Sequence, residues 1–330
     1  MTTITIAVID KPRKCSPLLT EFQDTLCQMD TPGFRFIRFD VDTPFSESCS
    51  TTLNGKPPDY IYLGYHTDRY LERNWKQIDG HDIKFMAETM NCDIYPTLDT
   101  YHHLHKAKPS LLIIRTLNHC EDVLDMIRSS DPRVGGAGVA YVPFGSHPRL
   151  YRPRHHRPLD VSAIMSSSCS FVLHKGKRAL FKALNDASCT VNTEQVWDQG
   201  YRDVLTRSKL FIIMGENNTF VQKYVECGMA GCVVVGEMPD EARHILDGAM
   251  VECDCPGKVD VVLREVLSHP AKYVKMGMEL RRRLVATRHV GLMCNWFLDM
   301  LSDHMDGRLG TVENQFYLLR AHDFANLKQM

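Results

Sequence analysis

The first half of the chain alternates short apolar runs with stretches of helical spacing. An apolar run predicts a buried strand at residues 4–9, and alternation predicts a strand at residues 34–39. Further strands are predicted at residues 59–64, 111–114 and 139–143. Between the first two strands, residues 18–29 carry apolar side chains at helical spacing, and the pair Pro32-Gly33 ends this pattern. Strands that alternate with helices imply parallel βαβ units, in a sheet that helices cover on both faces.

The same alternation begins again after residue 160. Strands are predicted at residues 161–165, 171–174, 211–214, 232–236 and 249–253, and helices at 177–187, 220–230, 259–267, 270–305 and 312–330. Each half holds roughly the 150 residues of an ordinary domain. The chain is therefore predicted to be an α/β protein with two Rossmann-like domains, the first over residues 1–150 and the second over residues 151–305.

A segment without periodicity, residues 147–158, separates the two halves. It holds three prolines, four arginines and three histidines. Two interpretations are open: a solvated connector, or a basic lip over an anionic ligand between the domains. Ligands of parallel sheets bind at the carboxyl ends of the strands, where helix N-termini favour anions such as diphosphate.

Composition narrows the class of protein. The 330 residues are 44% apolar and 24% charged, as in a folded soluble protein, and the net charge of −1 argues against a general polyanion binder. The sequence shows no apolar run of about 20 residues that predicts a membrane span, and no signal-peptide pattern. The twelve cysteines are expected to be reduced thiols of a cytoplasmic protein, and their spacing does not predict a zinc site.

Motifs for common cofactors and nucleophiles are not found in the sequence. It has no dinucleotide-binding or P-loop glycine pattern and no nucleophile elbow. The glycines of residues 135–138 precede a strand and are interpreted as a turn. His102 and His105 are three residues apart, but without nearby carboxylates they favour ordinary histidines over a metal site. No metal site is therefore predicted.

Residues 201–239 are the most informative segment. They run from a short helix through a buried strand, a polar loop at residues 215–219 and a helix to another buried strand. Lys223 and Glu226 are three residues apart on one face of that helix. The carboxylate can bind a ribose diol and the lysine a phosphate, or the two can form a surface ion pair. Spacing alone does not separate these alternatives.

Three stretches resemble retaining glycosyltransferases of the GT-B fold (family 4-like), especially the glycosyltransferase-like domain of bacterial spore-maturation proteins. Lys223-Tyr-Val-Glu226-Cys-Gly-Met-Ala-Gly231 resembles the family's K-x-x-E-x-x-A-x-G stretch. The segment that starts at Lys175 is similar to its K-G-x-x-x-L-x-x-A stretch, and residues 142–148 are similar to its P-x-G-x-x-P stretch. The matches follow the family's order and cover about residues 140–250.

The resemblance implies a GT-B fold, in which two parallel sheets face each other across a cleft. It implies a UDP- or GDP-linked sugar as co-substrate on the second domain, an acceptor on the first, no metal, and a C-terminal helix over residues 306–330 that crosses back to the first domain. The candidate residues are Lys175, Arg178 and Lys223 for the diphosphate, Glu226 for the ribose, and Gly215, Glu216 and Asn218 for the sugar. An inverting enzyme would need a base from the first half, with His119 or Asp10 as candidates.

Two positions depart from the family pattern. Residues 167–170 are Ser-Ser-Cys-Ser where the family usually has Gly-Arg, and Asn218 stands where it has an acid. A nucleotide-sugar epimerase or hydrolase, or a binding protein without catalysis, is therefore the alternative. The acceptor is open among a glycan, a protein and a modified nucleobase, and the neutral charge disfavours a nucleic acid. As a cleft carboxylate, Glu226 is expected to contribute little to folding stability.

Overall fold

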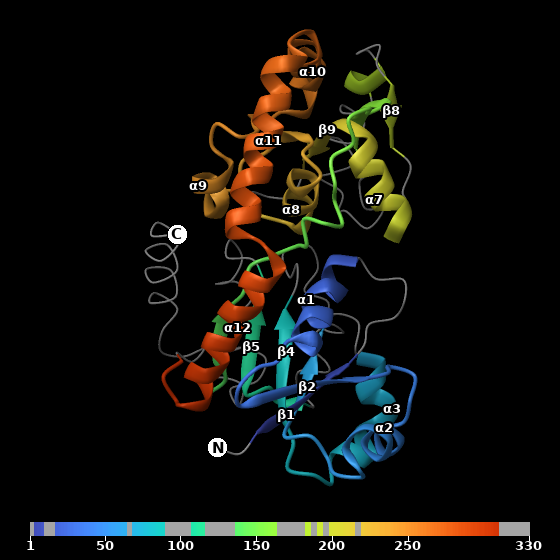
Figure 1. Ribbon diagram of the computed structural model, residues 1–330, viewed down its shortest axis with the longest axis vertical. Helices are drawn as coiled ribbons and strands as arrows, with labels where there is room; N and C mark the ends of the chain where they lie inside the picture. The colour runs from blue at the N-terminus through green and yellow to red at the C-terminus, as the bar shows by residue number, and fades with distance from the viewer. Residues whose placement is uncertain are drawn as a thin grey trace. The chain divides into compact units, whose positions relative to one another are not determined.

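Contacts divide the chain into two compact units (Figure 1). One unit holds residues 1–143 and 291–330, and the other holds residues 144–290. The structure, a computed structural model, describes residues 3–9, 17–64, 68–89, 107–115, 136–163, 182–185, 190–193, 198–214 and 219–309.

The first unit is built on a parallel sheet with the strand order β2-β1-β3-β4-β5-β6. The strands are β1 (Ile4–Ile9), β2 (Phe34–Phe39), β3 (Tyr60–Leu63), β4 (Lys84–Thr89), β5 (Leu111–Ile114) and β6 (Gly138–Tyr141). Ile4 lies opposite Phe34 of β2, and Ile6 lies opposite Tyr60 of β3. The centre of the sheet is buried on both faces, which explains why β1 and β5 are almost uninterrupted apolar runs.

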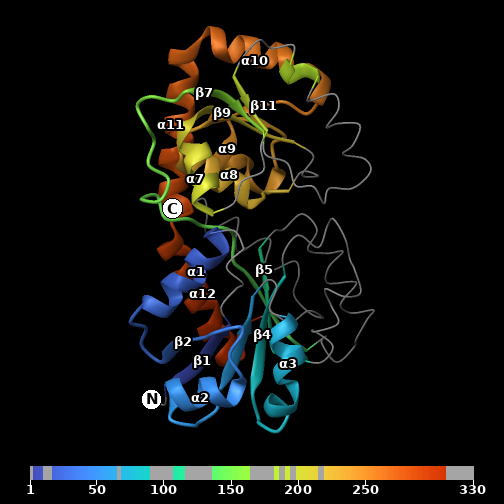
Figure 2. The ribbon, with the colours of Figure 1, turned by 90° about the vertical axis from the view of Figure 1, so that its right-hand side faces the viewer.

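Helices cover both faces of this sheet, and Figure 2 shows α1 and α12 on one side of it and α3 on the other. The helices are α1 (Pro17–Gln28), α2 (Phe45–Leu53), α3 (Asp68–Ile78) and α12 (Val290–Met305). Phe297 of α12 packs within 5.8–6.4 Å, between ring centroids, of Phe22, Phe36 and Tyr62. The core cluster on the α2 and α3 side joins Ala7, Ile9, Phe39, Ile61 and Leu63 to Phe45, Cys49, Tyr70, Leu71 and Ile78.

The second unit has a parallel sheet with the order β11-β10-β9-β7-β8. Its strands are β7 (Leu159–Ser162), β8 (Val191–Asn192), β9 (Ser208–Ile213), β10 (Val233–Gly236) and β11 (Val251–Glu252). Its helices are α7 (Asp198–Arg207), α8 (Gln222–Met229), α9 (Arg243–Leu246), α10 (Val259–Ser268) and α11 (Pro270–Thr287), with 3-10 turns η2 (Asp240–Ala242) and η3 (Pro256–Lys258). The α/β class with two parallel sheets is as the sequence predicts, whereas β4 and β8 were not predicted.

Close packing between α8 and α11 depends on a glycine. A Cβ atom added at Gly228 would lie 2.2 Å from Cδ1 of Leu284 and 3.0 Å from Cγ of Leu280. A larger residue here would require the side chains of Leu280 and Leu284 to move. The packing fixes α8, which carries Lys223 and Glu226, against the body of the unit.

The helical pattern over residues 270–305 proves to be two helices. Arg288 and His289 separate α11 from α12, and here the backbone pairs with another segment: the amide of Ser146 donates to the Arg288 carbonyl at 2.9 Å, and the amide of Val290 donates to the Ser146 carbonyl at 3.0 Å. These tertiary bonds, rather than a proline or glycine, interrupt the helix. Residues 291–305, which the sequence analysis assigned to the second domain, group with the first unit.

Some predicted elements lie outside the described residues. They include the strand at residues 171–174, most of the helix at 177–187 and the helix at 312–330. The prediction that residues 306–330 cross back to the first domain therefore stays a prediction. Among the helices that the structure describes, none has the length and hydropathy needed to span a membrane.

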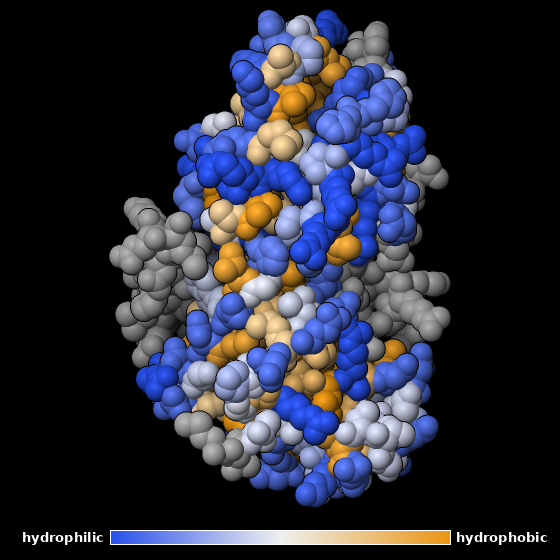
Figure 3. Space-filling model, in the orientation of Figure 1, coloured by the Kyte–Doolittle hydropathy of each residue, from blue (hydrophilic) through white to orange (hydrophobic). Residues whose placement is uncertain are grey.

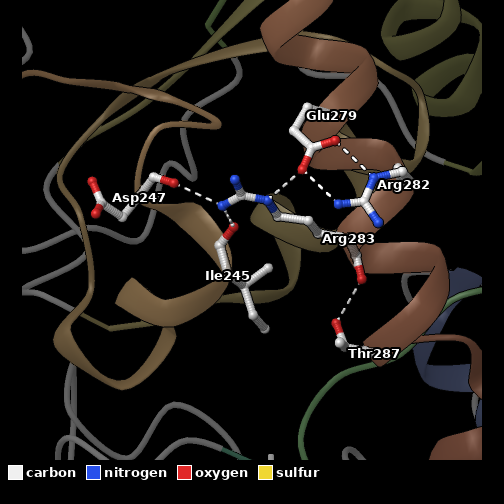
Figure 4. Close-up of polar contacts among 6 residues, drawn as sticks. All are labelled: Ile245, Asp247, Glu279, Arg282, Arg283 and Thr287. Carbon is white, nitrogen blue, oxygen red and sulfur yellow. Dashed lines mark hydrogen bonds and ion pairs between the residues drawn. The ribbon is translucent and has the colours of Figure 1, made fainter. Parts of the chain in front are cut away.

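An arginine cluster fastens α11 to the end of α9 (Figure 4). Nη1 of Arg283 donates to the carbonyls of Ile245 and Asp247, at 3.0 and 2.7 Å. Glu279 accepts hydrogen bonds from both Arg282 and Arg283, which lower the pKa of its carboxyl to about 2. Arg283 thus supplies the carbonyl groups at the end of α9 with a donor.

Replacing Arg283 by methionine is expected to lower the free energy of unfolding by about 1–2 kcal/mol, because two carbonyls lose a charged donor. Arg282→Met is the matched control, since Arg282 shares Glu279 but is exposed and contacts neither α9 carbonyl. Urea unfolding of both variants measures the difference. Equal losses in the two variants would contradict a specific role for the α9 carbonyls.

The cysteines that the structure describes are free thiols: Cys27, Cys49, Cys227, Cys232, Cys253, Cys255 and Cys294. Burial raises the pKa of the Cys49 and Cys232 thiols to about 11, so they stay protonated and unreactive in the folded protein. Thiol titration of denatured, unreduced protein is expected to find all twelve cysteines of the sequence. A shortfall of two or more would show a disulfide among the five cysteines outside the described residues.

The face shown in Figure 3 is largely polar with small apolar interruptions, some of them over α10 and α11. Among the residues that the structure describes, the exposed large apolar side chains are Leu150, Val261, Val274 and Met278. Scattered apolar residues of this kind are normal on a protein surface.

Candidate functional site

The candidate site is built on the β9–α8 connection of the second unit. Strand β9 ends at Ile213, and α8 begins at Gln222. The start of α8 is held by a buried carboxylate, because Oε1 of Glu241 accepts a 2.6 Å hydrogen bond from the Phe220 amide. Tyr224 of α8 donates from its hydroxyl to the Glu237 carbonyl at 2.6 Å. A helix that follows a parallel strand in this way begins at the carboxyl edge of the sheet, where α/β proteins bind ligands.

Glu226 is a buried carboxylate on α8, with only 2% of its surface exposed. Its Oε1 atom accepts hydrogen bonds from Nε2 of Gln222 at 3.3 Å and from the hydroxyl of Tyr151 at 3.5 Å. Tyr201 of α7 also lies against it: burial, and then the charge of Glu226, raise the pKa of Tyr201 well above its ordinary value. Glu226 is therefore not an exposed surface carboxylate.

A buried carboxylate is costly unless donors surround it. Here the donors come from three parts of the unit: α7, α8 and the segment before β7. Two of them are tyrosine hydroxyls, and the raised pKa of Tyr201 keeps its hydroxyl protonated and able to donate. Lys223, one turn earlier on α8, is partly buried. The arrangement places a carboxylate, surrounded by donors, on the helix that follows β9.

The arginine-rich segment of residues 147–158 is fastened to this unit. Arg157 donates from Nη2 to the Ala230 carbonyl and from Nη1 to the Ser208 carbonyl, each at 2.6 Å. Arg154 forms an exposed ion pair with Asp203 of α7 at 2.9 Å. Arg157 thus binds the C-terminal end of α8 and the first residue of β9, so for this residue neither a solvated connector nor a basic lip is correct.

Most of the predicted site residues lie outside the described part of the chain. Lys223 and Glu226 are described, and the structure places them on adjacent turns of α8. The others are Gly215, Glu216, Asn218, Lys175, Arg178 and His119, together with Asp10. Their roles stay predictions.

Sequence reasoning missed the two tyrosines at Glu226. Tyr201 begins the segment that the sequence analysis singled out, but it was not recognised as a partner of the carboxylate. Tyr151 lies 75 positions before Glu226, in a segment without periodicity. No spacing rule joins residues so far apart, and only the fold brings them together.

The first unit holds a second buried polar cluster, also unpredicted. Nε of Arg115 donates to Oε1 of Glu88 at 2.9 Å, and the Tyr62 hydroxyl donates to Oε2 of Glu88 at 2.6 Å. Nη1 of Arg115 donates to the Val142 carbonyl at 3.1 Å, and the guanidinium lies 4.2 Å from the Phe22 ring centroid. Burial alone would lower the pKa of Arg115, but Glu88 and Tyr62 raise it above its ordinary value.

Comparison with solved structures finds the same fold in glycosyltransferases. HepE of Anabaena matches with a TM-score of 0.62 and 11% identity, over 91% of this chain and 100% of HepE. Sucrose-phosphate synthase of Thermosynechococcus elongatus matches with a TM-score of 0.59 and 10% identity, over 92% and 100%. A glycosyltransferase of Rickettsia africae matches with a TM-score of 0.59 and 8% identity, over 92% and 99%.

These likenesses show the fold, the α/β GT-B fold with two parallel sheets that the sequence predicts. At this level of identity they do not extend to activity. HepE has been crystallised with UDP and glucose and with UDP-glucose. No protein-family model matches the sequence, and no curated protein is significantly similar to it.

Proposed function

We propose that this chain is a glycosyltransferase that moves a sugar from a UDP- or GDP-linked donor to an acceptor hydroxyl. The observation that carries the proposal is Glu226, a buried carboxylate held by tyrosine and glutamine donors on the helix that follows β9. The resemblance of residues 223–231 to the glycosyltransferase motif assigns this glutamate to the ribose of the donor. The helix that carries it follows a strand of the second parallel sheet. The UDP bound by HepE, a protein of the same fold, supports uracil as the first base to test.

The proposed roles follow the chemistry of the side chains. Glu226 accepts hydrogen bonds from the ribose hydroxyls, and Lys223 neutralises phosphate charge as a compact cation. Lys175 and Arg178 complete the diphosphate site. Gly215, Glu216 and Asn218 line the sugar pocket, and the first unit binds the acceptor.

Catalysis would rest on positioning and electrostatics. The bond from the anomeric carbon to the diphosphate oxygen breaks, and cationic side chains stabilise the departing nucleoside diphosphate. The acceptor oxygen bonds to the same carbon, and in the proposed retaining reaction its proton passes to the leaving phosphate. No protein base and no metal are then needed. An inverting reaction would assign the proton to His119 or Asp10.

A thermal-shift panel of UDP, GDP, ADP and their sugar conjugates, in EDTA, tests donor binding. A ligand at 100 times its dissociation constant stabilises the protein by about 2.7 kcal/mol, so a rise of several degrees is expected with one nucleotide family. Failure of every nucleotide to stabilise the protein, both in EDTA and with added Mg²⁺, would overturn the proposal. Stabilisation only after Mg²⁺ is added would contradict metal independence.

Turnover separates the proposed reaction from its alternatives. The selected donor is incubated with and without a pool of sugars and sugar alcohols, and its consumption is followed by chromatography. Consumption that needs the acceptor pool supports transfer, whereas equal consumption without it identifies a hydrolase. The anomeric coupling constant of the product, measured by NMR, then shows retention or inversion.

A further inference from the structure

The segment that precedes β7 contributes a side chain to the surroundings of Glu226. Tyr151 is fully buried, and its hydroxyl lies 3.5 Å from Oε1 of Glu226. The Cζ atom of Arg202 of α7 lies 6.0 Å from the Tyr151 ring centroid. The Tyr151 hydroxyl donates the hydrogen bond to Glu226, because an ionised carboxylate has no proton and can only accept.

The backbone around Tyr151 is fixed from α11. Nη1 of Arg281 donates to the Tyr151 carbonyl at 2.9 Å, and Nη2 donates to the Pro148 carbonyl at 3.1 Å. Further along the segment, Arg157 binds the carbonyl of Ala230, the C-cap residue of α8. Arg281 and Arg157 therefore fix the backbone at Tyr151 and further along the segment. This keeps the Tyr151 hydroxyl next to α8.

Tyr201 approaches the same carboxylate from α7. Its hydroxyl stays protonated, since burial and the charge of Glu226 raise its pKa well above the ordinary value. The two tyrosines come from different parts of the chain and converge on one group. Neutral hydroxyl donors of this kind stabilise the ionised form of a carboxylate and restrict its rotamer.

We propose that Tyr151 and Tyr201 are positioning residues, which hold the Glu226 carboxylate ionised and in the one orientation that binds a ribose diol. This inference rests on the proposed function, because it assigns Glu226 to the ribose of the donor. The inference adds the segment before β7 to the donor site. Tyr151 of this segment would not touch the nucleotide, but would act on it through its hydrogen bond to Glu226.

Tyr151→Phe tests the inference, since it removes the hydroxyl and keeps the ring in place. Calorimetric titration of UDP, or of GDP if the thermal-shift panel selects it, is carried out between pH 5 and pH 8. The affinity is expected to fall about three- to tenfold at pH 7, the effect of one ordinary hydrogen bond. On acidification the variant is expected to lose affinity at a higher pH than the wild type, because its carboxylate protonates more easily.

A 2′-deoxynucleotide separates positioning from a general structural effect. Without one ribose hydroxyl, the ligand depends less on Glu226, so wild type and Tyr151→Phe are expected to differ less for the deoxy ligand than for the ribonucleotide. Tyr273→Phe is the matched control, because its hydroxyl lies 3.3 Å from the carboxylate of Glu265 in the same unit. Tyr201→Phe is expected to behave like Tyr151→Phe, and melting curves confirm that each variant folds.

The outcomes of these titrations separate failure of this inference from failure of the proposed function. Unchanged affinity and pH dependence in Tyr151→Phe and Tyr201→Phe, with a wild type that binds UDP, would overturn this inference and leave the proposed function standing. An equal loss for ribo- and deoxynucleotides would also overturn it. A wild type that binds no nucleotide overturns the proposed function, and this inference with it.

Discussion

Glu226→Gln is expected to weaken UDP binding about ten- to a hundredfold, because it removes the negative charge that receives the ribose hydroxyls. A hydrogen bond to a charged group contributes roughly 1.5–3 kcal/mol, and 1.4 kcal/mol corresponds to a factor of ten in affinity. Glutamine has nearly the same size as glutamate, so it fits the same buried position. Calorimetric titration of UDP into wild type and variant measures the effect.

Burial changes what is expected of an alanine at this position. An exposed cleft carboxylate could be removed with little effect on folding, but Glu226 is buried and accepts hydrogen bonds from Gln222 and Tyr151. Alanine would leave these donors without their acceptor, at a cost of roughly 1–3 kcal/mol for a buried unsatisfied group. Glu226→Ala is therefore expected to lose stability as well as affinity, and glutamine is the cleaner test.

Glu265→Gln serves as the control for Glu226→Gln. Glu265 is a half-exposed carboxylate on α10 that lies near a tyrosine hydroxyl and a lysine, and the proposed site does not include it. Its replacement is expected to leave UDP affinity unchanged. If Glu226→Gln binds UDP as well as this control does, Glu226 does not contact the nucleotide, and the assignment of the donor site to α8 is wrong.

The strands that the sequence predicted best are those buried on both faces. The runs at residues 4–9 and 111–114 coincide with β1 and β5, whereas β2, at the edge of the sheet, was predicted from the alternation of its residues. In a parallel sheet covered on both faces, burial makes almost every position apolar, so the run itself marks the strand. The predicted ends of the strands are less exact. Strand β9 begins at Ser208, whereas its predicted run began at residue 211.

Strand β4 was missed because its ends carry charge. Its residues read Lys84-Phe-Met-Ala-Glu-Thr89, a short apolar centre between a lysine and a glutamate. Glu88 is nevertheless buried, since Arg115 and Tyr62 supply donors to its carboxylate. A charge that is buried because a distant residue compensates it has no signature in local sequence.

The candidate site, too, was predictable where it depends on local sequence and not where it depends on tertiary contacts. The spacing of Lys223 and Glu226, with the family resemblance, was sufficient to place both on one helix after a buried strand. The burial of Glu226 and its contacts with Tyr151 and Tyr201 depend on how α7, α8 and the segment before β7 pack. These contacts join residues that are distant in the chain, and a local pattern does not encode them.

The Arg115–Glu88 pair of the first unit offers the largest expected change in stability. Both side chains are almost completely buried, at 3% and 1% exposure, and Glu88 also binds the Tyr62 hydroxyl. Removing one partner of a buried ion pair leaves the other charge uncompensated in a medium that solvates it poorly, at a cost of about 3–5 kcal/mol. Arg115→Met is therefore expected to lower the melting temperature by roughly 10 °C, since 1 kcal/mol corresponds to about 2–4 °C in a unit of this size.

A second substitution distinguishes charge from packing. Glu88→Gln alone should also destabilise the unit, because it leaves the Arg115 guanidinium without its counter-charge. In the double variant Arg115→Met/Glu88→Gln no buried charge remains, so its loss is expected to be clearly smaller than the sum of the single losses. Arg73→Met, which breaks the exposed pair with Asp42 in the same unit, is the control and is expected to cost less than about 1 kcal/mol. Additive losses in the double variant would mean that Arg115 stabilises the unit through its packing on Phe22 and its bond to the Val142 carbonyl, not through the ion pair.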